Sequence, residues 1–147
     1  MNKTVIETTN APGAIGPYSQ GWTVGDLIFT SGQIPVDPAT GAIAEGITAQ
    51  AEQSCKNVGA ILAAAGVGFE NVVKTTCFLA DMGDFAAFNE AYAKFFTSKP
   101  ARSCVAVKEL PKGVVCEVEA IAVKYTPHEK RPPEGGLFSC LFTCAGR

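Results

Sequence analysis

Residues 114–123 read VVCEVEAIAV, a run of small and β-branched residues with two carboxylates inside it. Such a run predicts a β-strand. Its apolar residues fall on both sides of the strand, so both faces of its sheet need a cover. A second predicted strand, VVKTTCFLA at residues 72–80, has the same property. The helices available to cover these strands therefore decide the architecture.

Two segments have the spacing of amphipathic helices. From Thr48 onward, apolar residues recur every three or four positions and form one stripe, which Gly66 ends as a C-cap. Asp84, a candidate N-cap, precedes a second stripe made of Phe85, Phe88, Tyr92 and Phe95. Two helices with one stripe each can cover only one face of a sheet. The bare face predicts a homo-oligomer with clefts between its subunits.

Further strands complete the predicted order β, β, β, α, β, α, β, β. We expect a short strand at residues 3–8 and a hairpin at residues 20–34, turning at Gly25 and Asp26. Another strand is expected at residues 102–108, directly before the strand predicted at residues 114–123. This order indicates an α+β domain with a mixed sheet.

Length and composition indicate one globular domain. The chain has 147 residues, 47% of them hydrophobic and 18% charged. We assign residues 1–124 to the domain and residues 125–147, which change abruptly in composition, to a C-terminal extension of unknown role. A net charge of −2 provides no positive field for a phosphate backbone, which argues against nucleic acid. Without a membrane span or a secretory signal, we expect a cytoplasmic protein.

The six cysteines form no CxxC pair. We expect the four before position 120 to be small buried apolar residues. A nucleophilic Cys104 would need a base to ionise it, and the only histidine, His128, lies in the extension. Cys140 and Cys144, also in the extension, are poor evidence for a metal site. We therefore expect neither covalent thiol catalysis nor a metal.

Charged residues in the last two predicted strands form a candidate site. Glu117 and Glu119 are two residues apart and point to the same side of the sheet. A buried carboxylate is costly unless it is paired or solvated, and Arg102 on the neighbouring predicted strand is the natural partner. The alternative is a purely structural ion pair between Arg102 and a glutamate. Loops at predicted strand ends supply further candidates, namely Tyr18, Ser31 and Gly32.

Four motifs in this order closely resemble the RidA family, also called YjgF: GPYSQ at 16–20, SGQIP at 31–35, PARSCV at 100–105 and EVEAIAV at 117–123. The likeness runs from about residue 3 to residue 124. It implies a chorismate-mutase-like α+β fold, with two helices on one face of a mixed sheet, assembled as a homotrimer with a cleft at each subunit interface. It also implies a hydrolase that converts 2-imino acids, such as 2-iminopropanoate and 2-iminobutanoate, to 2-keto acids and ammonia without a cofactor.

The resemblance also implies residue roles. Arg102 would hold the substrate carboxylate with its planar fork, and Glu117 would activate water and carry the proton. The backbone of Cys104 would add polar contacts, and Glu119 would be structural. The pocket would be lined by Tyr18, Ser31 and Gly32, with Asn89 joining from the same or a neighbouring subunit. The connection before PARSCV is shorter than in some members of the family, so the rim of the cleft departs from the family pattern.

Two alternatives come from other functional classes. The family has also been described as an endoribonuclease and translation inhibitor acting on single-stranded RNA, but the basic residues here are scattered. Only a trimer that concentrated Lys99, Arg102 and Lys108 on one surface would favour it. A non-catalytic binder of small carboxylates would also use Arg102, but Glu117 would weaken its affinity for anions. The sequence therefore favours hydrolysis.

Overall fold

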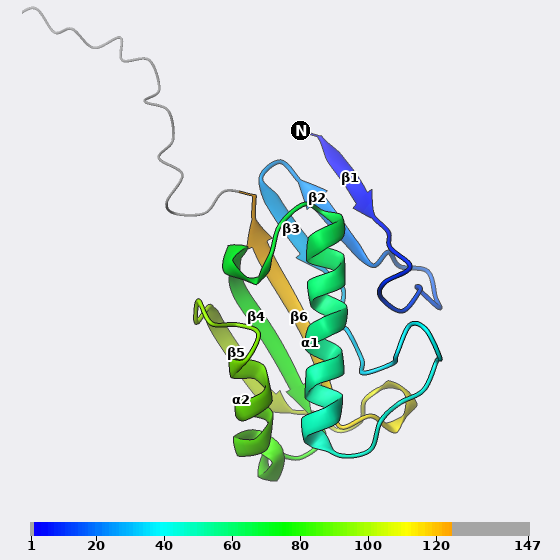
Figure 1. Cartoon of the computed structure of the whole chain (residues 1–147), viewed down its shortest axis with the longest axis vertical. Helices are drawn as coiled ribbons and strands as arrows, with labels where there is room; N and C mark the ends of the chain where they lie inside the picture. The colour runs from blue at the N-terminus through cyan, green and yellow to red at the C-terminus, as the bar shows by residue number, and fades with distance from the viewer. Residues whose placement is uncertain (1, 125–147) are drawn as a thin grey trace, which may run out of the picture.

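The computed structural model describes residues 2–124 of the chain (Figure 1). The extension, with His128, Cys140 and Cys144, lies outside the described residues. The described elements follow the predicted order: β1 (Lys3–Ile6), β2 (Gly21–Val24), β3 (Leu27–Thr30), α1 (Ile47–Ala64), β4 (Val72–Leu79), α2 (Phe85–Ala93), β5 (Ala101–Ala106) and β6 (Cys116–Val123). The hairpin strands are shorter than predicted, because residues after Thr30 leave the regular strand.

The strands form a single mixed sheet in the order β1-β2-β3-β6-β4-β5. β4 and β5 run parallel, whereas the other neighbouring pairs are antiparallel. Parallel neighbours need a crossover connection, and the segment containing α2 supplies it. β6 is therefore inserted between β3 and β4, which leaves β5 at an edge of the sheet.

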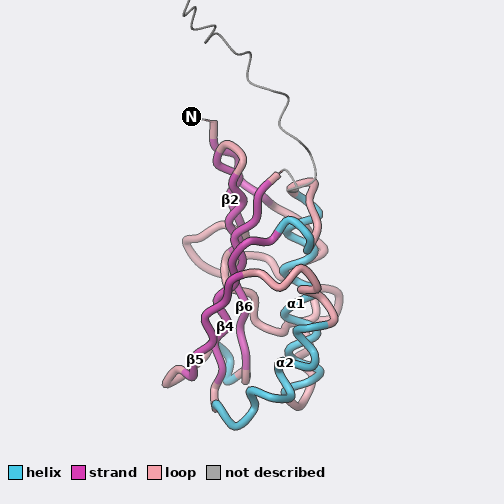
Figure 2. Tube along the Cα trace, turned by 90° about the vertical axis from the view of Figure 1, so that its left-hand side faces the viewer, coloured by secondary structure: helices cyan, strands magenta, loops and turns pink. Residues whose placement is uncertain are grey.

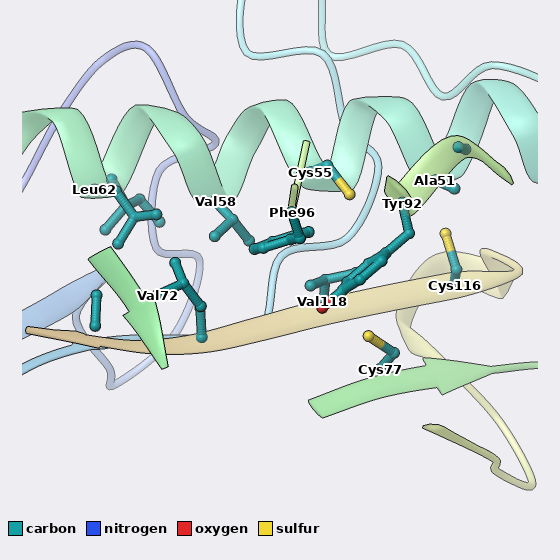
Figure 3. Close-up of a cluster of buried hydrophobic side chains, with 14 of the residues drawn as sticks. Ala51, Cys55, Val58, Leu62, Val72, Cys77, Tyr92, Phe96, Cys116 and Val118 are labelled. Atoms are coloured by element: carbon teal, nitrogen blue, oxygen red, sulfur yellow. The ribbon is translucent and has the colours of Figure 1, made fainter. Parts of the chain in front are cut away.

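Both helices pack on the same face of the sheet, as predicted (Figure 2). Val58 and Leu62 of α1 are fully buried against the sheet, where Val118 of β6 is also fully buried (Figure 3). Below α2, the hydroxyl groups of Thr75 and Tyr92 share a buried hydrogen bond of 2.7 Å. No helix among residues 2–124 is long and apolar enough to cross a membrane.

Of the two helix caps predicted from the sequence, the glycine cap of α1 forms as expected and the aspartate cap of α2 makes no side-chain bond. Gly66 has φ +83° and its N–H donates to Ala63 O at 2.9 Å, so the predicted glycine C-cap is confirmed. Asp84 occupies the N-cap position of α2, but its side chain makes no capping bond. Asp81 instead accepts the N–H of Gly83 at 2.7 Å in the turn before the helix.

The face of the sheet opposite the helices is open, and over β1, β2 and β3 it is apolar. In β3, Ile28 is fully buried whereas Leu27 and Phe29 are 42% and 38% exposed, so these two point away from the helices. Trp22 pairs with Phe29, and Val5 pairs with Trp22, which extends the apolar surface to the other edge. Contiguous apolar surface of this kind marks an interaction site. The homotrimer remains a prediction.

Three of the four cysteines within residues 2–124 are fully buried, as expected: Cys55, Cys77 and Cys116. Burial is the main cause that raises the thiol pKa of Cys77 to about 12 and that of Cys116 to about 11. Cys104 differs, because it lies half-buried on the edge strand β5, so the expectation of a buried residue is wrong there. Burial also raises its thiol pKa, which disfavours the nucleophilic thiolate.

Candidate active site in two half-sites

A pocket of about 580 Å³ gathers four of the predicted site residues, and we call it the carboxyl pocket. Its lining comprises Ile15, Tyr18, Thr30, Ser31, Gly32, Ile34, Pro111, Glu117 and Glu119. The polar groups come from three separate segments of the chain, which the sheet and its loops bring together.

The backbone between β3 and β6 places glycine against the Glu117 carboxyl. Gln33 N–H donates to Val118 O at 2.8 Å, and Val118 N–H donates to Gln33 O at 3.1 Å. This bridge carries Gly32 so close to Glu117 that a Cβ at position 32 would overlap the carboxylate. A side chain at this position would therefore displace the carboxyl group, which explains the glycine in SGQIP.

Hydrogen bonds from Ser31 hold the loop before β2 against the end of β3. The Ser31 N–H donates to Gln20 O at 2.8 Å, and its hydroxyl donates to Ser19 O at 2.6 Å. The buried Gln20 side chain donates to Pro12 O at 2.8 Å and so holds the loop from within. Tyr18 stands at the rim with 51% of its surface exposed. The Ser31 proton is thus committed to the loop, which leaves the hydroxyl oxygen as an acceptor.

Glu117 is a carboxyl group of this pocket with a shifted pKa. It is half-buried, and burial together with the like charge of Glu119 raises the pKa of Glu117 above its ordinary value. No cation neutralises it, since the single ion pair among the described residues joins Lys94 to Glu52 at 2.8 Å elsewhere. A carboxyl with a raised pKa that lines a pocket can both take and return a proton.

Arg102 lies on the other side of the sheet, under α2. Its Nη1 donates to Asn89 Oδ1 at 2.8 Å. The guanidinium carbon lies 4.9 Å from the Tyr92 ring centroid and 5.5 Å from that of Phe85, both within cation–π range. Asn89 therefore joins Arg102 from the same chain. The aromatic support was missed at the sequence level, where Phe85 and Tyr92 were read only as part of an apolar stripe.

Arg102 lines a second pocket, of about 330 Å³, which we call the arginine pocket. Its lining comprises Asn89, Tyr92, Ala93, Phe96, Lys99, Pro100 and Arg102. Lys99 was considered from the sequence only as an RNA contact. No group of three or more His, Cys, Asp or Glu side chains among residues 2–124 could hold a metal ion.

Within one chain, the two pockets do not meet. Glu117 pairs with Phe78 of β4, and Phe78 pairs with Val105 of β5, so a whole strand separates Glu117 from Arg102. Two strand spacings across and three residues along put their Cα atoms roughly 14 Å apart, with the side chains on opposite faces. The prediction that Arg102 lies on the strand next to Glu117 is wrong. A structural ion pair between them is equally excluded within the chain.

The edge strand β5 also presents unpaired backbone. Val107 N–H donates to Leu79 O at 2.9 Å, toward β4. Because alternate residues of a strand direct their backbone groups to opposite sides, those of Arg102 and Cys104 point to the free edge. The backbone N–H and C=O of Cys104 are therefore directed away from β4, toward the edge of the sheet. The predicted contact between this backbone and the substrate stays a prediction.

The family model described as Endoribonuclease L-PSP matches residues 8–124. The chain is 57% identical over 128 residues to the 2-iminobutanoate/2-iminopropanoate deaminase of Salmonella typhimurium, covering 84% of this chain and 99% of the relative. The protein of the same name from Escherichia coli K12 is 55% identical over 128 residues, with the same coverage.

Solved structures of similar proteins have the same fold. The crystal structure of E. coli TdcF with bound serine superposes with a TM-score of 0.81 at 51% identity, covering 83% of this chain and 99% of that one. The structure of the YjgF gene product from E. coli gives a TM-score of 0.81 at 52% identity, with the same coverage.

Proposed function

Because this chain belongs to the endoribonuclease L-PSP family, which includes the RidA/YjgF proteins, we infer that it is an enamine/imine deaminase. It hydrolyses reactive 2-imino acids, such as 2-iminopropanoate and 2-iminobutanoate, to 2-keto acids and ammonia. The observation that carries this conclusion is the 55–57% identity to deaminases of that specificity over 99% of their length. The fold is the α+β fold that the resemblance implied, with both helices on one face of the sheet.

We propose that the active site forms between two copies of the chain. The arginine pocket of one copy, with Arg102, Asn89 and the free edge at Cys104, would face the carboxyl pocket of another. Three observations support this arrangement: the distance between Arg102 and Glu117 within a chain, the unpaired edge of β5, and the bare apolar face of the sheet. A closed homotrimer would repeat one such interface three times by symmetry.

The chemistry follows from these side chains. Arg102 keeps further N–H groups beyond the one given to Asn89, and they hold the substrate carboxylate beside the C=N carbon. The Glu117 carboxylate takes a proton from water while the water oxygen bonds to that carbon. Glu117 then returns this proton to nitrogen, which gives a carbinolamine with one hydroxyl and one amino group. It next takes the hydroxyl proton and passes it to the amino group, so the C–N bond breaks and ammonia leaves as the keto group forms. Atoms and charge balance without a redox partner.

Ammonia release from a transient imine tests the proposed function. A threonine dehydratase dependent on pyridoxal phosphate supplies 2-iminobutanoate, which also hydrolyses on its own. Adding the protein should speed the appearance of 2-oxobutanoate and ammonia in proportion to its concentration, and heat-denatured protein should not. A rate that never departs from spontaneous hydrolysis would overturn the assignment.

The alternatives have weaker support. The RNA-directed alternative lacks the cluster it needs within residues 2–124: Lys99 and Arg102 share one pocket, but Lys108 lies outside it. Arg102 is also engaged by Asn89 and by two aromatic rings under α2. The raised pKa of Glu117 suits a proton carrier and serves no purpose in a passive receptor for anions.

The pH profile gives a prediction for Glu119. Its like charge is the second cause that raises the pKa of Glu117, after burial. Glu119→Gln removes that charge, so the pKa of Glu117 should fall while staying above its ordinary value. Since the Glu117 carboxylate accepts the proton from water, the acidic limb of kcat/KM against pH should move to lower pH. A limb that stays in place or moves upward would show that another group governs it.

A further inference from the structure

The arginine pocket contains more positive charge than one carboxylate requires. Arg102 is placed to hold the carboxylate that every 2-imino acid carries, yet Lys99 lines the same pocket. None of the described residues that line it is acidic. Among residues 2–124 the one ion pair joins Lys94 to Glu52, so no carboxylate there neutralises Lys99. Two cations in one concave site favour a ligand with two negative groups.

The backbone conformation at Lys99 holds this residue at the pocket. Lys99 has φ +54°, in the left-handed region that residues with a side chain rarely adopt. Its N–H donates to Phe96 O at 3.1 Å, and Pro100 with its restricted φ follows directly. Phe96 is 2% exposed and stacks on Tyr92 with centroids 4.4 Å apart. A buried aromatic stack thus anchors the turn that carries Lys99, and such strain persists only where the surroundings determine it.

Between the two cations the pocket is mainly apolar. Ala93, Phe96 and Pro100 form walls, and the amide oxygen of Asn89 is already occupied by Arg102. Lys99 is therefore the cationic group, besides Arg102, that can meet a substrate side chain in this pocket, and the Asn89 amide nitrogen is a neutral donor beside it. Lys99 and Arg102 are three residues apart, so their Cα atoms are at most about 10 Å from each other. The volume of about 330 Å³ admits a four- or five-carbon diacid.

We propose that the enzyme accepts 2-imino acids with a second carboxylate, such as 2-iminosuccinate, and that Lys99 binds this second carboxylate. This inference rests on the proposed function, because it names a substrate class for the same site. Arg102 holds the carboxylate next to the imine, and the Lys99 ammonium meets the distal one. The reaction is the same hydrolysis, in which water replaces nitrogen and ammonia leaves.

The test compares two substrates generated in the same way. An amino-acid oxidase, with catalase present, supplies 2-iminosuccinate from aspartate or 2-iminopropanoate from alanine, and kcat/KM is measured for each. Lys99→Gln should lower the ratio of the dicarboxylate value to the monocarboxylate value roughly fivefold to tenfold. Lys99→Arg should preserve the ratio. Raising the salt concentration should lower the ratio for the parent protein and leave it nearly constant for Lys99→Gln.

Lys108→Gln is the matched control, since it removes an exposed lysine beyond the other end of β5 and outside the pocket. Its ratio should equal that of the parent. An unchanged ratio in Lys99→Gln, with 2-iminopropanoate still hydrolysed, would overturn this inference and leave the proposed function standing. If the parent hydrolysed neither of the two imines, the proposed function itself would be overturned, and this inference with it.

Discussion

Replacing Arg102 with alanine is expected to lower kcat/KM for 2-iminopropanoate by about a hundredfold or more. The change removes two charge-assisted hydrogen bonds to the substrate carboxylate, each worth roughly 1.5 to 3 kcal/mol. Without the planar fork, the imine carbon is no longer held in one orientation toward the attacking water. The measurement is the rate of 2-oxopropanoate formation from imine generated in situ.

The fold should survive this substitution. Arg102 contributes a hydrogen bond to Asn89 and contacts with two rings, so its loss should cost about 1 kcal/mol of stability. Tyr92 keeps its buried hydrogen bond to Thr75 and its place in the core. Arg102→Lys, which keeps the charge without the fork, should recover only part of the activity. Activity of Arg102→Ala within a few-fold of the parent would remove Arg102 from its role.

Glu117→Gln should abolish turnover while leaving ligand binding intact. The amide has the shape of the carboxyl group but cannot accept the proton of water, so kcat should fall by about a hundredfold to ten-thousandfold. Because the substitution also removes a negative charge from the pocket, 2-oxobutanoate should bind at least as tightly as to the parent. Calorimetric titration with the keto acid, next to the imine assay, separates the two effects.

Two results for Glu117→Gln would contradict its role as proton carrier. If kcat stayed within a few-fold of the parent value, another group would have to carry the proton. If binding of the keto acid were lost together with turnover, the role of Glu117 would be structural. Glu119→Gln is the matched control, because it makes the same chemical change in the same pocket and should move only the pH profile.

The elements and their order could be predicted from local sequence. The period of three and four residues after Thr48 and the glycine at position 66 define α1 and its end, because helix stripes and left-handed caps are local properties. The bare apolar face also followed from two helices with one stripe each. These features depend on residues within a few positions of each other.

The spatial order of the strands could not be read from chain order alone. β5 and β6 follow one another in sequence, which suggested that Arg102 and Glu117 lie on adjacent strands. The structure instead joins β4 and β5 as parallel neighbours through α2 and puts β6 on the other side of β4. The signal was present, since strands that flank a helix commonly form a parallel pair. Applying it would have placed Arg102 at the edge.

The sequence named candidate site residues but not their positions relative to one another. The motifs contain Tyr18, Ser31, Gly32 and Glu117 of one pocket and Arg102 of the other, yet the two pockets lie on opposite faces of the sheet. Contacts between copies leave only an indirect trace in a single sequence, here the bare face. Lys99 was overlooked as a pocket residue because its position depends on the buried stack of Phe96 on Tyr92, which is a tertiary contact.

The central claim, a site shared by two copies, is tested most directly by mixing the two inactive variants. Arg102→Ala and Glu117→Gln chains are unfolded together, refolded at equal concentration and assayed, with each variant refolded alone as the control. If Arg102 of one copy works with Glu117 of another, random assembly into a closed ring should restore about one quarter of the parent activity per site. Mixtures no more active than the separate variants, despite proven exchange of subunits, would contradict the shared site.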